Sequence, residues 1–517
     1  MPYSSASGKA WSERIIKRLI AKCRNNSILD VGAGAGNYHD LLRSQLPSTE
    51  FHGIEIWEPY IEKYSLEEKY DQMIKADIRA FTPQKIYGIT LLGDILEHMT
   101  KEEAIKVYYK LLNASEYVLI SIPVVNYPQD EYMGNPYEKH VKDDWSHNEV
   151  LASFDCLPLY HLENEIGIYV GYNPKLQKKE GLLDANKPAC AVYGIYKNEE
   201  KFMARFLNSV KDADEIVLCD TGSADQTNTI LQNFKEQNPG VNLKTYQIFV
   251  SPWRFDDARN TALALIDGDM DICISLDIDE YLMENWREVL SSKWDLNFTR
   301  YYHKFKTIWA NGRFSAHWHE RIHKRHGYTW KLPVHEILEY QGEEKICWTD
   351  DLWIYHEPEH KKSRSSYLPM LEQSVKERPD VWKTWSFLAG EYLSASRFEE
   401  ALAAIDKALA LKDSDKGYLY KMKHHLYRNQ NKQALAMLNL NTSISYLPNR
   451  REPYFEKARY LHQLGRNIEA YLTLIEAQKL NQKIIDYHYH PDCWDEEFDK
   501  FMREARELAQ KEWLLYE

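Results

Sequence analysis

One stretch in the middle of this 517-residue chain constrains its fold more than any other. Residues 272–276 read Ile-Cys-Ile-Ser-Leu, an apolar run typical of a buried strand, and Asp277 and Asp279 follow it. Because side chains alternate between the two faces of a strand, both carboxylates are expected to point the same way. They repel each other unless a cation lies between them, and oxygen ligands favour Mg²⁺ or Mn²⁺, ions that commonly hold a phosphate. The stretch predicts a metal site, with a solvated acidic strand end as the alternative.

Length and composition limit the remaining choices. A chain of 517 residues is expected to form roughly three domains. Its net charge of -13 argues against a nucleic acid as partner. The seven cysteines are scattered and form no C-x-x-C pair, which fits a reducing cytoplasm. No apolar segment has the length of a membrane span, so we expect a cytoplasmic protein without stable membrane insertion.

Near the N-terminus a short apolar run ends in Asp30 and continues into three glycines at alternate positions, Gly32, Gly34 and Gly36. A helix is expected to follow. A strand, a glycine turn and a helix are typical of a nucleotide-binding unit, because glycine lets the backbone approach a ligand closely. The spacing D-x-G-x-G-x-G differs from the G-x-G-x-x-G of dinucleotide-binding proteins. A plain tight turn is the alternative.

Acidic residues close the strands that are expected next. Glu55 ends the second apolar run, where it can accept two ribose hydroxyls, and Asp77 ends the third, where it can accept an adenine amino proton. Asp94 follows the fourth run and opens the segment Asp-Ile-Leu-Glu-His. The ends of successive parallel strands share one edge of the sheet, where α/β sheets bind ligands.

This ordered set of motifs resembles the class I S-adenosylmethionine-dependent methyltransferases over residues 1–172. The resemblance implies a Rossmann-like α/β domain with S-adenosylmethionine (SAM) as cofactor. The implied cofactor-binding residues are Asp30, Gly32, Gly34, Gly36, Glu55, Asp77 and Asp94. His140 lies in a segment that resembles the acceptor side, and it is a candidate general base because methyl transfer to a hydroxyl needs a proton acceptor. A surface histidine is the alternative.

Residues 173–188 are polar and rich in turn formers, and they are interpreted as a linker. Residues 189–360 then alternate between apolar runs and amphipathic helices. The motifs in this region are N-E-E at 198–200, D-T-G-S-x-D at 220–225, F-x-x-A-R-N at 255–260 and L-D-x-D-E at 276–280. Together they resemble the GT-A nucleotide-diphospho-sugar glycosyltransferases, specifically family 2.

That resemblance implies an α/β GT-A domain, a UDP- or GDP-type sugar donor and an inverting transfer. The residues implied at the donor are Asn198, Glu199, Asp220, Arg259, Asn260 and Asp277. Arg259 would offer charge-assisted hydrogen bonds to phosphate, and Asp279 would bind Mn²⁺ or Mg²⁺ with help from Asp277. His335 and His356 lie in segments that also resemble the family, and one of them would complete the metal shell.

Glu336, next to His335, is the predicted base that deprotonates the acceptor hydroxyl. The aspartate motif that commonly supplies this base in family 2 is not found in the chain. The Q-x-x-R-W motif of processive polysaccharide synthases is also absent, which favours an enzyme that adds a single sugar.

Residues 361–517 carry a repeat and are expected to be all-α. Ala401 and Ala434 are 33 positions apart (434 − 401), and Ala434 and Ala470 are 36 apart (470 − 434). Small residues at a period of about 34 are typical of tetratricopeptide-like helix pairs, which can hold a peptide or another subunit. A helical cap that only buries the transferase domain is the alternative.

The combined prediction is a bifunctional enzyme that transfers a sugar to a protein, peptide or glycan and methylates an acceptor, which can be the same product. The repeats would offer a surface to a protein partner. The alternative is a glycosyltransferase whose N-terminal domain binds SAM without catalysis and serves as a scaffold.

Overall fold

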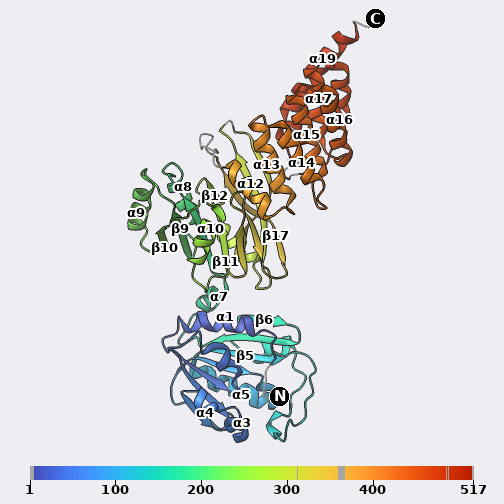
Figure 1. Ribbon diagram of the computed structural model, residues 1–517. Helices are drawn as coiled ribbons and strands as arrows, with labels where there is room; N and C mark the ends of the chain where they lie inside the picture. The colour runs from blue at the N-terminus through green and yellow to red at the C-terminus, as the bar shows by residue number, and fades with distance from the viewer. Residues whose placement is uncertain (1–4, 311, 359–366, 485, 487, 515–517) are drawn as a thin grey trace. The chain divides into compact units, whose positions relative to one another are not determined.

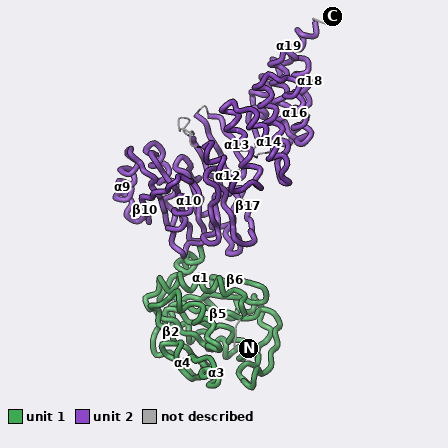
Figure 2. Tube along the Cα trace, in the orientation of Figure 1, with its two compact units in different colours: residues 1–187 green, residues 188–517 purple. Residues whose placement is uncertain are grey.

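The computed structural model describes residues 5–310, 312–358, 367–484, 486 and 488–514. The chain forms two compact units, residues 1–187 and residues 188–517 (Figures 1 and 2). The boundary between the units falls at the end of the predicted linker 173–188, and the predicted third domain from residue 361 stays a prediction.

Unit 1 is built on a seven-stranded sheet with the order β3-β2-β1-β4-β5-β7-β6. The strands are β1 (Ser27–Val31), β2 (Glu50–Glu55), β3 (Gln72–Lys75), β4 (Tyr87–Gly93), β5 (Ser115–Pro123), β6 (Leu159–Glu163) and β7 (Ile166–Tyr172). The first five run parallel, and β7 is antiparallel to both of its neighbours. β1 lies between β2 and β4, so the strand order reverses there, and such a switch point is where open α/β sheets bind ligands.

The helices of unit 1 are α1 (Lys9–Ile20), α2 (Asn37–Leu42), α3 (Glu58–Lys63), α4 (Leu66–Lys69), α5 (Lys101–Asn113), α6 (His147–Ser153) and α7 (Lys179–Asn186). Helix α7 occupies half of the predicted linker. Leu182 and Ala185 are buried, and Arg14 of α1 donates a hydrogen bond to the Asn186 carbonyl oxygen. This polar segment folds onto unit 1 because α7 carries an apolar face. The overall polarity of the segment hides the helical spacing of its apolar residues.

Unit 2 contains an eight-stranded sheet with the order β10-β9-β8-β11-β14-β13-β17-β12. Its strands are β8 (Cys190–Tyr196), β9 (Glu215–Asp220), β10 (Leu243–Gln247), β11 (Ile272–Ser275), β12 (Glu280–Leu282), β13 (Arg300–Ile308), β14 (Phe314–Lys324) and β17 (Ile346–His356), and β15 (Tyr328–Lys331) and β16 (Ile337–Tyr340) form a separate hairpin. Strands β8 to β11 are mutually parallel, whereas β14 pairs antiparallel with β11. Val192 and its neighbour Tyr193 enter different apolar clusters, as expected for a strand covered on both faces.

The helices of unit 2 are α8 (Met203–Val210), α9 (Thr227–Gln237), α10 (Phe255–Ala264), α11 (Trp286–Lys293), α12 (Tyr367–Glu377), α13 (Trp382–Ser394), α14 (Phe398–Leu409), α15 (Lys416–Asn429), α16 (Gln433–Tyr446), α17 (Arg451–Gln463), α18 (Asn467–Gln478) and α19 (Glu496–Trp513). Figure 1 shows α12 and α13 beside the sheet and α19 at the far end of the helical tail. Val334 packs with Leu371 of α12 and Leu388 of α13, so the tail begins as part of the core of this unit.

The helical tail repeats in its geometry. Helices α14, α16 and α18 begin at residues 398, 433 and 467, which are 35 and 34 positions apart (433 − 398 and 467 − 433). A left-handed residue precedes each of them, namely Ser396, Asn431 and Gly465. The buried alanines of the three helices are Ala401, Ala436 and Ala470, whereas Ala434 is exposed. The sequence analysis therefore chose the wrong alanine in the second pair, and the corrected period is close to 34. The tetratricopeptide-like assignment itself stays a prediction.

Across the described residues, no helix combines the length and the apolar composition that are needed to cross a bilayer.

Candidate functional sites

Unit 2 has a cavity of about 890 Å³ at the edge of the sheet where β8 and β11 end. Eight of the ten predicted donor, metal and base residues line it: Asn198, Glu199, Arg259, Asp277, Asp279, His335, Glu336 and His356. Small-molecule sites measure roughly 300–1,000 Å³, so the cavity has the size of a ligand site. Parallel pairing of β8 and β11 explains why the N-E-E and D-x-D motifs, far apart in sequence, meet here.

Asp277 is held by two arginines. Arg259 Nη2 lies 2.6 Å from Asp277 Oδ1, and Arg321 Nη2 lies 3.3 Å from Oδ2. Burial alone would raise the pKa of Asp277, but the two guanidinium groups lower it well below its usual range. Both carboxylate oxygens are therefore occupied by arginines, which differs from the expectation that Asp277 assists the metal.

Asp279 faces a different partner, His356. The distance from His356 Nε2 to Asp279 Oδ2 is 3.5 Å. The antiparallel pairing of β12 with β17 brings them together, since it places Glu280 opposite His356. Burial by itself would lower the pKa of His356, but Asp279, Glu280 and Asp277 together raise it. Of the two histidines that were candidates for the metal shell, this geometry favours His356.

His335 also lines the cavity. Its backbone is left-handed, with φ of 52°, and its ring stacks on Phe387 of α13 with 4.0 Å between centroids. Glu336, the predicted base, also lines the cavity, and its Oε1 lies 3.3 Å from Arg259 Nε. Arg259 thus holds Asp277 and Glu336 on either side of one buried guanidinium.

Two predicted donor residues have structural contacts and do not line the cavity. Asp220 accepts hydrogen bonds from the Gly222 and Ser223 amides and from Asn228 Nδ2. Burial alone would raise the pKa of Asp220, but these hydrogen bonds lower it. The Asn260 side chain donates a hydrogen bond to the Trp330 carbonyl oxygen and accepts one from the Trp330 amide. These two bonds fix β15 against α10.

Sequence reasoning missed Arg321 and Glu280. Arg321 lies on β14 next to Ile322, and Ile322 pairs with Ile274 of β11. A local sequence pattern cannot predict such a long-range contact. Glu280 is 2% exposed and accepts a hydrogen bond from the Asp277 amide at 2.9 Å. Burial, with a further contribution from Asp277, raises the pKa of Glu280 to about 7. Glu280 is part of the L-D-x-D-E motif. The signal that could have identified it is its place in a paired strand, β12.

In unit 1, two adjoining cavities of about 80 and 60 Å³ lie at the switch point of the sheet. The first is lined by Asp30, Gly32, Gly34, Glu55 and Asp94, and the second by Gly32 and Asp77. Ile95, His98 and Tyr137 line both cavities and form the wall between them. Six of the seven predicted cofactor residues therefore meet at one edge. The seventh, Gly36, lines neither cavity and precedes α2 with φ of 83°.

The acids of this cleft also hold its backbone. The Glu55 carboxylate accepts hydrogen bonds from the Gly34 amide at 3.0 Å and from the Trp57 amide at 2.8 Å. These bonds tie the glycine turn to the end of β2. The Asp30 carboxylate accepts a hydrogen bond from the Tyr70 hydroxyl, and burial raises the pKa of Asp30 to about 6. Asp77 is bound by the Arg79 guanidinium, with 2.8 Å between Asp77 Oδ2 and Arg79 Nη2.

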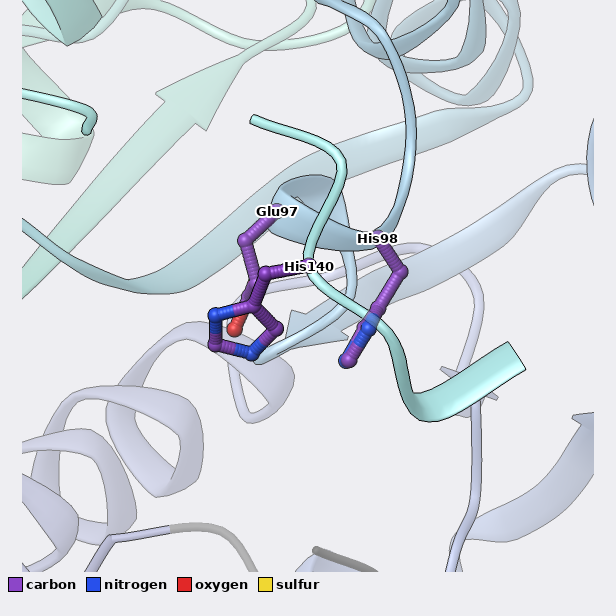
Figure 3. Close-up of side chains that lie close together, drawn as sticks. All are labelled: Glu97, His98 and His140. Atoms are coloured by element: carbon purple, nitrogen blue, oxygen red, sulfur yellow. The ribbon is translucent and has the colours of Figure 1, made fainter. Parts of the chain in front are cut away.

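His140, the predicted base, lines neither cavity. Its ring packs edge-on against that of His98, with 4.9 Å between centroids, and His98 borders both cavities. The predicted base is thus separated from the cofactor cleft by another histidine. Glu97 joins the two rings in a compact group (Figure 3).

Comparison with known proteins gives one domain assignment. Residues 194–340 match the family model described as Glycosyl transferase family 2. This region is a family 2 glycosyltransferase domain. The match lies within the predicted range 189–360 and covers the N-E-E, D-T-G-S, A-R-N and D-x-D motifs as well as Arg321, His335 and Glu336. A search of curated proteins finds no match.

Solved structures similar to the chain carry methyltransferase names. One is a Nostoc punctiforme protein named for O-methyl transfer, with 16% identity and a TM-score of 0.24 over 32% of this chain and 56% of its own. Others are the N-terminal domain of EvdMO1 with bound SAH (13% identity, TM-score 0.26, 33% of this chain and 82% of that one) and a SAM-dependent methyltransferase from Clostridium acetobutylicum (12% identity, TM-score 0.26, 32% and 91%). The chain thus spans about half of the Nostoc protein.

Proposed function

We propose that unit 2 is a divalent-metal-dependent glycosyltransferase that takes a UDP- or GDP-type sugar donor and inverts the sugar carbon. The family 2 domain supplies the reaction class. The observation that carries the rest is the meeting of Asp279 and His356, 3.5 Å apart, at the wall of a cavity of about 890 Å³.

Asp279 and His356 suit Mn²⁺ because one carboxylate and one imidazole leave room for diphosphate oxygens and waters in the shell. A bound cation would neutralise the charge that develops on the leaving diphosphate. Asp277, held by two arginines, would meet the donor through its ribose or through a metal-bound water. The arginines keep this carboxylate ionised, so it stays an acceptor of hydrogen bonds near neutral pH.

Glu336 is the proposed base. It takes the proton of the acceptor hydroxyl while that oxygen bonds to the anomeric carbon and the bond to the diphosphate breaks. Its Oε1 lies 3.3 Å from Arg259 Nε, and this contact orients the carboxylate at the cavity wall. Glu280 is buried beneath the D-x-D turn and does not line the cavity, so we assign it to positioning Asp277.

The acceptor is proposed to be a hydroxyl of a protein, peptide or glycan. Part of the cavity wall comes from the tail, because Tyr367 lines the cavity and Phe387 supports His335. The tail repeats would offer further surface to such an acceptor or to a partner protein.

For unit 1 we propose SAM-dependent methyl transfer, either onto the glycosylated product or onto its acceptor. The support is the convergence of Asp30, Gly32, Gly34, Glu55, Asp77 and Asp94 on one edge of the sheet. The alternative is SAM binding without catalysis, and it is favoured by the position of His140 outside both cavities. Finding SAH binding but no methyl transfer to any product or acceptor of unit 2 would select this alternative.

The decisive test for unit 2 uses the full chain with a panel of nucleotide sugars and Mn²⁺. A preferred donor should raise the unfolding temperature, and the Asp279→Ala variant should lose both this shift and Mn²⁺-stimulated donor hydrolysis. Asp351→Ala is the matched control, because Asp351 is largely exposed and does not line the cavity. Full metal-stimulated hydrolysis in Asp279→Ala would refute the metal assignment.

A further inference from the structure

Glu97, His98 and His140 form a compact group beside the cofactor cleft of unit 1. Each offers one ligand atom, and these atoms lie within 4.8 Å of one another. Glu97 and His98 belong to the turn after β4, and His140 lies on a separate loop; Figure 3 shows the three side chains extending in the same direction from the two segments. The backbone fixes this meeting, because the Val141 and Lys142 amides both donate to the Glu97 carbonyl oxygen.

Hydrogen bonds orient both imidazoles for metal binding. His140 Nδ1 lies 2.6 Å from the Tyr127 carbonyl oxygen, and His98 Nδ1 lies 3.2 Å from the Lys139 carbonyl oxygen. A carbonyl oxygen can only accept, so each Nδ1 carries the proton and each Nε2 keeps its lone pair. Metal-binding histidines characteristically donate their second nitrogen to such a partner, which fixes the ring and its tautomer.

Glu97 supplies an independent sign of a missing ligand. Its side chain is 3% exposed, and within the described residues no hydrogen-bond partner reaches Oε2. Leaving a buried carboxylate oxygen without a partner costs free energy, so such an atom calls for an explanation. A cation bound between Glu97 and the two Nε2 atoms provides one.

We propose that Glu97, His98 and His140 hold a divalent cation of the Zn²⁺, Mn²⁺, Fe²⁺ or Co²⁺ class, which binds the hydroxyl group that is to be methylated. Two imidazoles and one carboxylate suit these ions better than Mg²⁺ or Ca²⁺, which prefer oxygen ligands. Three protein ligands leave a position open for a substrate, as in catalytic zinc sites. Ligands of a tetrahedral ion lie about 3.3 Å apart, so the group needs only modest closure from its present limit of 4.8 Å.

The location of this site gives the cation a task. His98 lines both cavities of the cleft, so an ion on its Nε2 lies at the cleft wall, where His140 alone has no access. This part of the inference rests on the proposed methyl transfer. The ion lowers the pKa of the bound hydroxyl, whose proton passes to water. The hydroxyl oxygen then forms a bond to the methyl carbon, the carbon–sulfur bond of the sulfonium breaks, and the sulfur keeps the electron pair.

The open positions also favour one acceptor class. When the ion expands to five ligands, as catalytic zinc can, two neighbouring hydroxyls can occupy its two remaining positions, so a vicinal diol of a sugar should bind better than a deoxy analogue. Such diols occur in the sugars that unit 2 is proposed to transfer, which would link the two reactions chemically.

The test is a Co²⁺ titration of the full chain, followed by the visible absorption of the bound ion. The Asp279→Ala background removes the proposed metal site of unit 2. In that background His140→Ala and His98→Ala should weaken Co²⁺ binding on the order of 100-fold, since even residues that only orient ligands cost 10–100-fold. Glu97→Gln keeps the side-chain shape and should weaken binding in the same direction. His161→Ala is the control, because His161 stacks on Trp11 away from the group.

The outcomes separate this site from the proposed methyl transfer. SAH binding, measured by calorimetry, should be retained in His140→Ala, which also shows that the variant is folded. Loss of Co²⁺ binding with retained SAH binding supports the site, whatever the transfer assay gives. Co²⁺ binding of wild-type strength in both histidine variants would overturn it. Wild-type methyl transfer that persists after the chain has been freed of metal would overturn the task proposed for the ion in that transfer.

Discussion

Arg259 is the residue whose replacement should reveal most about the glycosyltransferase site. Its side chain is 5% exposed and contacts two carboxylates, Asp277 at 2.6 Å and Glu336 at 3.3 Å. Arg259→Met keeps much of the apolar volume but leaves both carboxylates without this partner. Removing one member of a buried ion pair typically costs about 3–5 kcal/mol.

The expected cost is lower in this case, because the Asp277 side chain is 37% exposed and keeps Arg321 as a partner. We expect Arg259→Met to lower the free energy of unfolding of unit 2 by about 2–3 kcal/mol. At about 2 °C per kcal/mol for a unit of this size, the unfolding temperature should fall by about 5 °C. Adding Asp277→Asn should recover part of the loss, because it removes the stranded charge.

Scanning calorimetry of the full chain measures this change. Arg466→Met is the control, since Arg466 is 47% exposed and pairs with Glu469 three residues away, where the expected change is within about 0.5 kcal/mol. An Arg259→Met variant that unfolds within 1 °C of wild type, on the order of the control's shift, would refute the claim that this guanidinium holds the site together. Donor binding should weaken in the same variant.

Two further predictions concern His356 and the tail. The pKa of His356 is raised in the folded chain, so its charge stabilises the metal-free protein below the ordinary pKa of about 6.5, and this contribution fades as pH rises through the raised value. The free energy of unfolding of His356→Asn, measured by chemical unfolding between pH 5 and 9 in EDTA, should therefore depend less on pH than that of wild type. An unchanged pH profile would contradict the pairing with Asp279. Ala436 is fully buried at a helix crossing, so Ala436→Leu should destabilise the tail by about 1–3 kcal/mol. Ala434→Leu, on the exposed face of the same helix, should leave the stability nearly unchanged. Equal shifts of the unfolding temperature in the two variants would contradict the corrected repeat.

The sequence was most informative where function depends on the ends of parallel strands. Asp77 and Asp94 could be placed because an acid after an apolar run reaches the ligand edge of a sheet wherever the run is parallel. The family 2 interpretation of the D-x-D region is confirmed by the family match, while the roles of individual residues remain predictions. Arg321 could not be found in this way, because its place depends on antiparallel pairing of β14 with β11.

Other misjudged positions have simple physical reasons. Asn260 follows the arginine of its motif, but on a helix the next residue points about 100° away, and its side chain bonds Trp330. Ala434 was preferred to Ala436 because both are small residues at the start of one helix, and only burial distinguishes them. The segment 173–188 was interpreted as a linker because it is polar and rich in turn formers, although Leu182 and Ala185 suffice to anchor a short helix within it.

The stacking of His335 on Phe387 has a consequence for how this enzyme can change over evolution. A residue of the catalytic cavity is held by a helix that also begins the repeat array, so the array is structurally continuous with the wall of the active site. Repeats added or lost beyond α14 would alter the reach of the protein without disturbing that wall. Exchange of α12 and α13, in contrast, would reshape the wall of the cavity. Selection can therefore act on two separate parts of one helical tail.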